Sequence, residues 1–266
     1  KSAASPAQAD EIRSRLENGP DPNLDILDIL RRHPPTWVDP AQFVSGLSPL
    51  KPRLYSISSS PKRHAGQVHL TVRRVSYERN GRSRKGVAST MLADRVTSGS
   101  SLRVFVQKSH GFRLPADPKT PVIMVGPGTG IAPFRAFLHE RDVLGAPGRT
   151  WLFFGDQRSS HDFLYQAELL DLKQRGILSR METAFSRDQE KKIYVQDRIR
   201  EHGAEIFSWL EAGAYLYVCG DAKRMATDVD RALRDLIAHS GSMTEQSARA
   251  YMAALTSSGR YLRDVY

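Results

Sequence analysis

Residues 121–130 read Pro-Val-Ile-Met-Val-Gly-Pro-Gly-Thr-Gly, and this stretch decides the fold class. A short apolar, β-rich segment runs into three glycines at alternate positions, and residues 131–138 then read as the start of a helix. Glycine allows positive φ and close approach of a ligand, while the first turn of a helix offers unpaired N–H groups to an anion. The stretch therefore predicts a pyrophosphate-binding turn at the end of a parallel strand. A turn that needs glycine only for tight packing is the alternative, since the spacing differs from the dinucleotide fingerprint Gly-x-Gly-x-x-Gly.

Downstream of this turn, strand patterns alternate with helix patterns. Strands are expected at Val122–Val125, Thr150–Phe154, Arg180–Phe185 and Tyr215–Val218. Helices are expected at Ala132–Leu144, Asp162–Gln174, Tyr194–Glu201, Lys223–His239 and Thr244–Leu255. Alternation of this kind predicts a parallel sheet covered on both faces, with ligands at the carboxyl ends of its strands. Residues 119–266 are therefore expected to form an α/β nucleotide-binding domain.

Upstream, the hydrophobic period changes to two. Strands are expected at Arg53–Ser58, Val68–Tyr77 and Leu102–Gln107, with turns at Asn80-Gly81 and Ser98-Gly99 and a helix within Gly86–Val96. Residues 45–118 therefore read as an antiparallel β domain. Residues 1–44 read as helical and irregular, with short helices at Ala7–Asn18 and Asp25–Arg32.

The composition is that of a globular protein: 40% of the 266 residues are hydrophobic and 26% are charged. No apolar run approaches the ~20 residues that span a bilayer, so no membrane association is expected. The single cysteine, Cys219, excludes an internal disulfide and a cysteine-held iron–sulfur cluster, and it fits a reducing cytoplasm. The net charge of +10 suits an acidic protein, a phosphorylated ligand or nucleic acid. No nucleic-acid-binding motif accompanies it, so most of the basic residues are expected to form a solvated surface, and nucleic acid is the least favoured partner.

A candidate site with basic side chains follows the third strand of the expected sheet. An NAD site normally places an acidic side chain there for the ribose 2′-hydroxyl. Here the strand opens onto Ser186 and Arg187, with Lys192, Tyr194 and Gln196 close behind. A hydroxyl and a guanidinium suit a 2′-phosphate, so NADPH is favoured over NADH. An exposed basic loop without a ligand is the alternative.

Further polar groups are suited to a second aromatic, phosphorylated ligand. Arg53 can bind a pyrophosphate, the Tyr55 ring can stack on a heterocycle, and the Ser56 hydroxyl can bond to a ring nitrogen. Residues 86–90 offer N–H groups and hydroxyls at a helix start, which is a second anion site. Cys219 directly follows the last expected strand, where it is either a small buried hydrophobe or a residue facing the crevice. Each segment taken alone is equally consistent with ordinary strand or cap chemistry.

Together these segments resemble a known family. The resemblance rests on these sequence segments: RLYSISSS (53–60), GVASTMLADRV (86–96), GPGTGIAPFRAF (126–137), FFGDQRSSHDFLYQAEL (153–169), AFSRDQEKKIYVQ (184–196), YVCGD (217–221) and RYLRDVY (260–266). In this order they are similar to the ferredoxin-NADP reductase module of diflavin reductases. That family includes the cytochrome P450 reductases, and the segments before residue 86 and around residue 112 lean toward the flavoprotein subunit of bacterial NADPH–sulfite reductase. The resemblance covers residue 50 to the end, and residues 23–50 more weakly.

The resemblance implies FAD and NADPH as cofactors and assigns roles by position. The implied FAD-binding residues are Arg53, Tyr55, Ser56, Gly86, Val87, Ala88 and Ser89. The implied NADPH-binding residues are Gly128 and Thr129 at the pyrophosphate and Ser186, Arg187, Lys192, Tyr194 and Gln196 at the 2′-phosphate and adenosine. Cys219 and Asp264 are implied to line the nicotinamide position, and Tyr266 is implied to cover the flavin. Hydride would pass from nicotinamide to flavin, with Ser56 donating to the flavin N5 and Asp264 steadying the positive nicotinamide product.

The resemblance also implies a partner and leaves an alternative open. Electrons would pass one at a time to an FMN-bearing, flavodoxin-like domain of acidic character, or to a sulfite reductase hemoprotein. The family's flavin barrel has six strands, whereas this chain offers material for about three, so the barrel is expected to be incomplete and residues 1–44 to be a remnant of the helical connecting region. A truncated NADP(H)-binding or docking fragment without flavin turnover is the alternative.

Overall fold

The computed structural model describes residues 5–17, 21, 24–109 and 111–266, which divide into two compact units. The first unit comprises the chain up to Leu54 together with Arg74–Ser101. The second comprises Tyr55–Arg73 and Leu102–Tyr266. Each unit has its own secondary structure.

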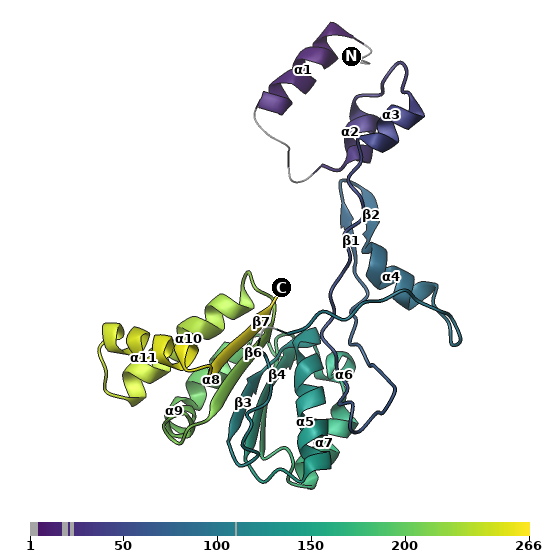
Figure 1. The fold of residues 1–266 in the computed structure, drawn as a ribbon. Helices are drawn as coiled ribbons and strands as arrows, with labels where there is room; N and C mark the ends of the chain where they lie inside the picture. The colour runs from purple at the N-terminus through teal and green to yellow at the C-terminus, as the bar shows by residue number, and fades with distance from the viewer. Residues whose placement is uncertain (1–4, 18–20, 22–23, 110) are drawn as a thin grey trace. The chain divides into compact units, whose positions relative to one another are not determined.

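The second unit is built on a five-stranded, fully parallel sheet (Figure 1). Its strands are β3 (Val122–Val125), β4 (Thr150–Asp156), β5 (Arg180–Phe185), β6 (Tyr215–Gly220) and β7 (Tyr261–Val265), in the order β5-β4-β3-β6-β7. From β3 the chain moves first toward β4 and β5 and later to β6 on the other side. The strand order therefore reverses between β3 and β6, and open α/β sheets bind ligands beyond the carboxyl ends at such a switch point.

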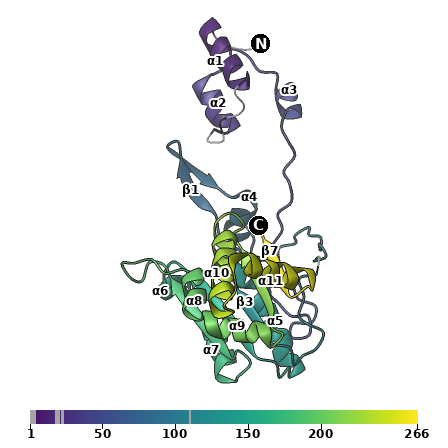
Figure 2. The same cartoon turned by 90° about the vertical axis from the view of Figure 1, so that its left-hand side faces the viewer.

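Helices cover both faces of this sheet, which explains why β3 is apolar at every position and fully buried (Figure 1). One face carries α5 (Ala132–Leu144), α6 (Ser159–Asp162) and α7 (Gln166–Gln174), and its core includes Phe134, Leu138 and Leu169. The other carries α8 (Val195–Glu201), α9 (Gly203–Glu211), α10 (Met225–Ser240) and α11 (Glu245–Ser257). Figure 2 views the sheet through α10 and α11. The expected parallel α/β sheet, covered on both faces, is confirmed.

The 55–73 segment is irregular and packs on α5 through polar contacts. The Arg135 guanidinium donates to the Ser58 carbonyl over 2.8 Å, and the Ser60 hydroxyl donates to Glu140 over 2.5 Å. Arg63 pairs with Asp142 at 2.8 Å. These contacts fix a segment that has only one isolated β-bridge, between Ile57 and Leu70.

The first unit contains helices and one antiparallel hairpin. Its elements are α1 (Pro6–Glu17), α2 (Ile26–Arg32), α3 (Pro40–Ser45), β1 (Ser76–Arg79), β2 (Arg82–Lys85) and α4 (Val87–Asp94). Asn80 and Gly81 both have positive φ (52° and 66°), which is the two-residue turn that fits the twist of a hairpin. Arg82 donates to both Asp25 and Asp28, the residues that form the capping box of α2. The helix is therefore held to the hairpin by charge.

The barrel strands are where the sequence-based expectation is wrong. Leu102–Gln107 forms no strand, and Val68–Tyr77 contributes only its last two residues to β1. Arg53–Ser58 supplies the single bridge at Ile57. Alternating apolar residues form a strand only where one face is covered, whereas Val104, Phe105 and Val106 are 80%, 60% and 75% exposed. The α/β sheet and one small antiparallel sheet are present among the described residues, but a closed barrel is not.

Candidate dinucleotide and flavin sites

The glycine turn after β3 has a structural reason at each glycine. Gly128 begins a short 3₁₀ turn, η1 (Gly128–Ile131), and has φ +56°, a conformation that side chains with a Cβ rarely adopt. A Cβ on Gly130 would lie 2.2 Å from the Cys219 carbonyl oxygen, and one on Gly126 would lie 2.5 Å from the Gly130 carbonyl. Gly130 thus allows close packing against the end of β6, Gly126 allows close packing within the turn and on the Phe134 ring, and Gly128 shapes the turn that faces the switch point.

Two residues implied to line the nicotinamide position, Cys219 and Asp264, and one implied to bind the flavin, Ser56, lie together beside this turn. Cys219 and Asp264 are direct partners in the register of β6 and β7. The Ser56 hydroxyl donates to Asp264 Oδ2 over 2.9 Å, although 208 residues separate them, and Cys219 Sγ lies 4.0 Å from the same oxygen. The 55–73 segment therefore brings a hydroxyl to a carboxylate and a thiol at the carboxyl edge of the sheet.

Cys219 is a neutral thiol in this environment. Its side chain is fully buried, and burial together with the neighbouring Asp264 charge raises its pKa to about 12. A thiol with such a pKa is protonated at neutral pH and is a poor nucleophile. Cys219 can therefore pack against a ligand at this position, but it cannot act as a thiolate.

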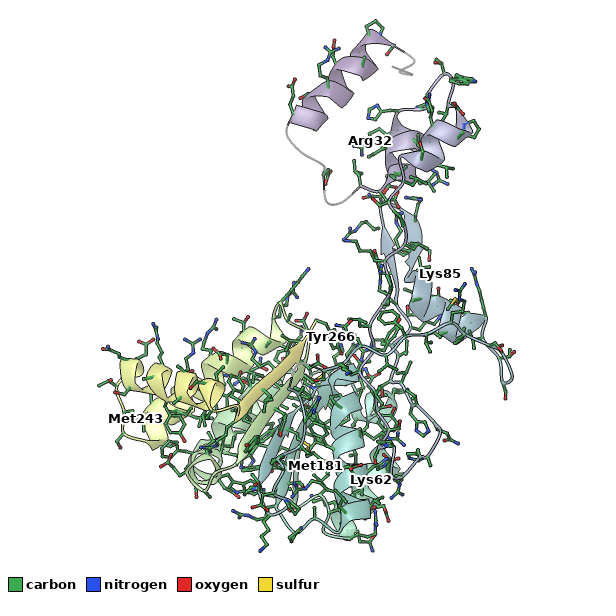
Figure 3. All side chains as sticks on the ribbon, viewed as in Figure 1. Arg32, Lys62, Lys85, Met181, Met243 and Tyr266 are labelled. Atoms are coloured by element: carbon green, nitrogen blue, oxygen red, sulfur yellow. The ribbon has the colours of Figure 1, made fainter. Side chains whose placement is uncertain are left out.

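Tyr266 connects the end of the chain with the glycine turn. Its hydroxyl lies 2.9 Å from Thr129 Oγ1, and its backbone N–H donates to the Gly220 carbonyl. The ring is 62% exposed and sits at the end of β7 (Figure 3). Burial of the hydroxyl raises its pKa, so it stays a hydrogen-bond donor at neutral pH. The structure thus places an exposed aromatic ring next to the turn implied to hold a diphosphate.

The residues implied to bind the 2′-phosphate follow β5. The backbone N–H groups of Ser186 and Arg187 donate to the carbonyls of Asp156 and Gln157, over 2.9 and 2.8 Å, so this turn is fixed to the end of β4. The Asp188 carboxylate accepts from the Ser159 N–H over 3.1 Å. The Arg187 side chain is exposed, as are those of Lys192 and Tyr194, whereas Gln196 is half-buried. The exposed groups are basic or aromatic, which fits a phosphorylated adenosine.

Arg73 and Asp156 also belong to this candidate site, although the sequence patterns did not predict them. The Arg73 guanidinium donates to Asp156 Oδ2 over 2.5 Å, and a Cβ on Gly128 would lie 3.7 Å from Arg73 Nη2 and 3.6 Å from that carboxylate oxygen. Arg73 is half-exposed, and the Asp156 carboxylate is 3% exposed. A guanidinium therefore lies beside the glycine turn, where a diphosphate would need positive charge. The available signal was Asp156, an acidic residue two positions after the expected Thr150–Phe154 strand.

Most residues implied to hold FAD belong to the first unit, whereas Tyr55 and Ser56 belong to the second. In the first unit, Gly86 caps α4, and the Ser89 hydroxyl accepts from the Val75 N–H over 3.1 Å. A Cβ on Gly86 would lie 2.6 Å from Ser89 Oγ. Val87 and Ala88 stand in the first turn of α4, whose N–H groups have no partner within the helix. The start of α4 is therefore suited to a phosphate group.

The remaining two flavin candidates differ in their surroundings. In the first unit, Arg53 is exposed and donates to the Lys51 carbonyl over 2.7 Å. Tyr55, in the second unit, is half-buried and directly precedes Ser56. A guanidinium, an aromatic ring and a hydroxyl are groups that fit a flavin nucleotide in chemistry.

Comparison with known proteins identifies both halves of the chain. Residues 9–91 match the FAD binding domain family, and residues 124–231 match the oxidoreductase NAD-binding domain family. These matches define the chain as a flavin- and pyridine-nucleotide-binding oxidoreductase module, and they support FAD and NADPH as its cofactors.

Similarity to individual proteins narrows the class of oxidoreductase further. The chain is 48% identical over 264 residues to the sulfite reductase [NADPH] flavoprotein alpha-component of Bacillus subtilis, which covers 97% of this chain and 44% of that protein. It is 51% identical over 244 residues to the same component of Photorhabdus laumondii, covering 92% and 40%. The component of Yersinia pestis is 50% identical over the same length. The chain is therefore similar over nearly its whole length to sulfite reductase flavoproteins, and it spans less than half the length of these relatives. No helix in the described part of the chain is long and apolar enough to cross a membrane.

Proposed function

We propose that this chain is a reductase module that oxidises NADPH with FAD and delivers the electrons singly to an FMN-bearing domain. The observation that carries the proposal is the meeting of Ser56, Cys219 and Asp264 at the carboxyl edge of the sheet, beside the glycine turn. The FAD-binding and NAD-binding family matches support the cofactors. Bound FAD supplies the acceptor for a hydride and the means to release its two electrons one at a time.

The chain's own residues bind and orient the pyridine nucleotide in this proposal. Gly128 and Thr129 offer the turn to the diphosphate, and Arg187 and Lys192 neutralise the 2′-phosphate. Tyr194 is open to stacking by the adenine. Because a 2′-phosphate is absent from NADH, this basic set makes the module selective for NADPH.

Ser56 and Asp264 act at the reacting end. The Ser56 hydroxyl has one proton, and in this structure it uses that proton to donate a hydrogen bond to Asp264. Binding of the flavin ring frees the Ser56 hydroxyl to donate to the flavin N5. Asp264 is then left to face the positive charge that develops on the nicotinamide. Cys219 packs against the nicotinamide ring as a neutral thiol. Tyr266 must swing aside to admit the nicotinamide.

The partner we propose is an acidic, flavodoxin-like FMN domain, with a sulfite reductase hemoprotein as the next acceptor. The net charge of +10 favours a partner of negative charge. A cytoplasmic location fits the single, buried free cysteine. A docking fragment without flavin is not favoured, because an FAD-binding family matches 83 residues between positions 9 and 91.

The test is anaerobic reduction of the FAD-loaded protein, followed by its visible spectrum. NADPH should bleach the flavin band, and NADH should do so far more slowly. Asp264→Asn should slow bleaching by NADPH about 10²-fold, the effect of one group that acts in the transition state. Arg187→Gln should instead reduce the preference for NADPH over NADH. Equal rates with both nucleotides in the wild type, or a protein that takes up no FAD, would refute the proposal.

A further inference from the structure

A basic hollow lies in the second unit where α10, α11 and β7 meet. Its volume is about 460 Å³, which is within the range of ligand sites. It is lined by Asp230, Arg234, Arg249, Met252, Ala253, Thr256, Tyr261 and Arg263. Three guanidinium groups, each from a different element, thus face a single lining carboxylate.

The hollow lies on the opposite face of the sheet from the Ser56–Asp264 pair. Side chains alternate along a strand, so Tyr261 and Arg263 of β7 share one face while Leu262 and Asp264 share the other. Tyr261 belongs to the core under α10 and α11, whereas Leu262 packs on the core under α5. A molecule bound in the hollow would therefore leave the proposed dinucleotide site open.

Positive charge in the hollow is only partly neutralised. Asp230 accepts from the Tyr261 hydroxyl over 3.5 Å and pairs with Arg234 at 3.0 Å. Arg249 pairs with Glu245 on the exposed surface of α11. The Arg263 guanidinium has no ion-pair partner among the described residues, and Arg234 Nε is buried without a hydrogen-bond acceptor there. Donors therefore remain for a carboxylate from outside.

The floor of the hollow selects the kind of anion. Met252 and Tyr261 are each 6% exposed and form its apolar base. Burial raises the pKa of the Tyr261 phenol, so it adds no negative charge at neutral pH. Arginine pairs best with planar carboxylates, and an apolar base favours a carboxylate on an aliphatic stem over a bare inorganic ion.

We propose that the α10–α11–β7 hollow is a docking site for an acidic segment of a partner protein, anchored by Arg263. The chain's charge of +10 attracts such a segment and repels a second copy of itself. Glutamate or aspartate side chains reach Arg263 and Arg249 from solvent while their stems cover Met252. Docking at this place does not require the proposed redox reaction, so either proposal can fail without the other.

The test measures anisotropy of a fluorescein-labelled hexaglutamate peptide with the full chain. Wild type should bind it, and a hexaglutamine peptide should not bind. Arg263→Gln and Arg249→Gln should each weaken binding about tenfold, the size of one charge-assisted hydrogen bond. The matched control is Arg231→Gln, which removes the same charge from an exposed α10 residue outside the hollow and should change binding less than twofold. Melting curves should show that all three variants are folded.

Other outcomes would overturn the proposal. Equal weakening by Arg231→Gln would mean diffuse attraction by net charge. Displacement of the peptide by NADP⁺ would place it at the dinucleotide site, and full displacement by millimolar inorganic phosphate would define a small-ion site. Absence of binding to the wild type would also refute it.

Discussion

Arg73 shows how a single side chain can join the parts of a nucleotide site. Its guanidinium lies beside Gly128 and is held by Asp156, whose backbone carbonyl also accepts from Ser186. Asp156 thus lies beside the turn proposed for the diphosphate and is bonded to the strand end proposed for the 2′-phosphate. Arg73 stands between them as a positive group that can serve the diphosphate.

Replacement of Arg73 should separate the two phosphate contacts. Arg73→Gln should raise the Kd for NADP⁺ about tenfold, because one charge-assisted contact to the diphosphate is lost. The Kd for 2′-AMP, which has no diphosphate, should stay within about twofold. Isothermal titration of both ligands measures this.

Arg187→Gln is the matched control for that measurement, because it should weaken NADP⁺ and 2′-AMP together. An Arg73→Gln variant that binds NADP⁺ as well as the wild type would contradict the role of Arg73.

Part of this site was expected from residue types and strand ends, and part, including Asp264, only from the family resemblance. Asp264 and Cys219 were implied as neighbours, and the structure puts them in register on β6 and β7. Arg73 and Asp156 could not be paired from the sequence, because their contact depends on the path of the irregular 55–73 segment across 83 residues. Side chains on irregular backbone have no period from which a direction can be inferred.

At the scale of elements, Glu168 of α7 ties together α5 and the 55–73 segment. Arg135 donates to it with two nitrogens, over 2.7 and 2.8 Å, while a third donates to the Ser58 carbonyl. Burial raises the pKa of Glu168, but the hydrogen bonds and charges of His139 and Arg135 outweigh burial and lower it to about 2. The segment that carries Ser56 thus depends on an ionised carboxylate.

This contact predicts a defined acid sensitivity. Because the pKa of Glu168 is lower in the folded than in the unfolded protein, its contribution to stability is complete above pH 4.5 and is lost as the pH falls toward 2. Glu168→Gln should cost about 3 kcal/mol of unfolding free energy at neutral pH and flatten that part of the pH profile. Urea denaturation between pH 2 and pH 7 measures both.

The control is Asp171→Asn on the same helix. Asp171 pairs with Arg175 at 2.9 Å in an exposed, one-turn contact, which is worth less than about 0.5 kcal/mol. If both variants lose the same stability, the Glu168 contact has no special weight.

The elements that the sequence revealed are those with a strong hydrophobic period. The structure confirms β3 and α5 at the predicted residues, because an all-apolar strand and a helix with a proline start are clear patterns. The β7 strand was not predicted from periodicity. It mixes charged and apolar residues at the sheet edge, so its pairing with β6 decides its conformation rather than its composition. Likewise α9 was not predicted: the expected helix ended at Glu201, and α9 begins at Gly203, one residue beyond the end of α8.

At the scale of the whole molecule, the charge of +10 should act on every anionic ligand. NADP⁺ carries its negative charge on the phosphates, which are the groups that the exposed Arg187 and Lys192 are proposed to meet. Salt screens exposed charges strongly, because the Debye length falls from about 10 Å at 0.1 M to about 3 Å at 1 M.

The affinity for NADP⁺ should therefore fall with salt. Between 0.05 and 0.5 M NaCl we expect the Kd for NADP⁺ to rise roughly tenfold, and the Kd for the less charged NAD⁺ to rise less. Titration calorimetry at three salt concentrations checks this. An affinity for NADP⁺ that does not change with salt would show that the basic surface plays no part in binding.

The alternation along β7 has a consequence for how this chain can change. Arg263 and Asp264 are adjacent, yet one faces the α10–α11–β7 hollow and the other faces Ser56. Loss or gain of one residue in the strand would exchange the two faces and remove both groups from their places at once. Point replacements can therefore alter docking and hydride chemistry independently during evolution, whereas single-codon deletions and insertions in β7 should be eliminated by selection on either trait.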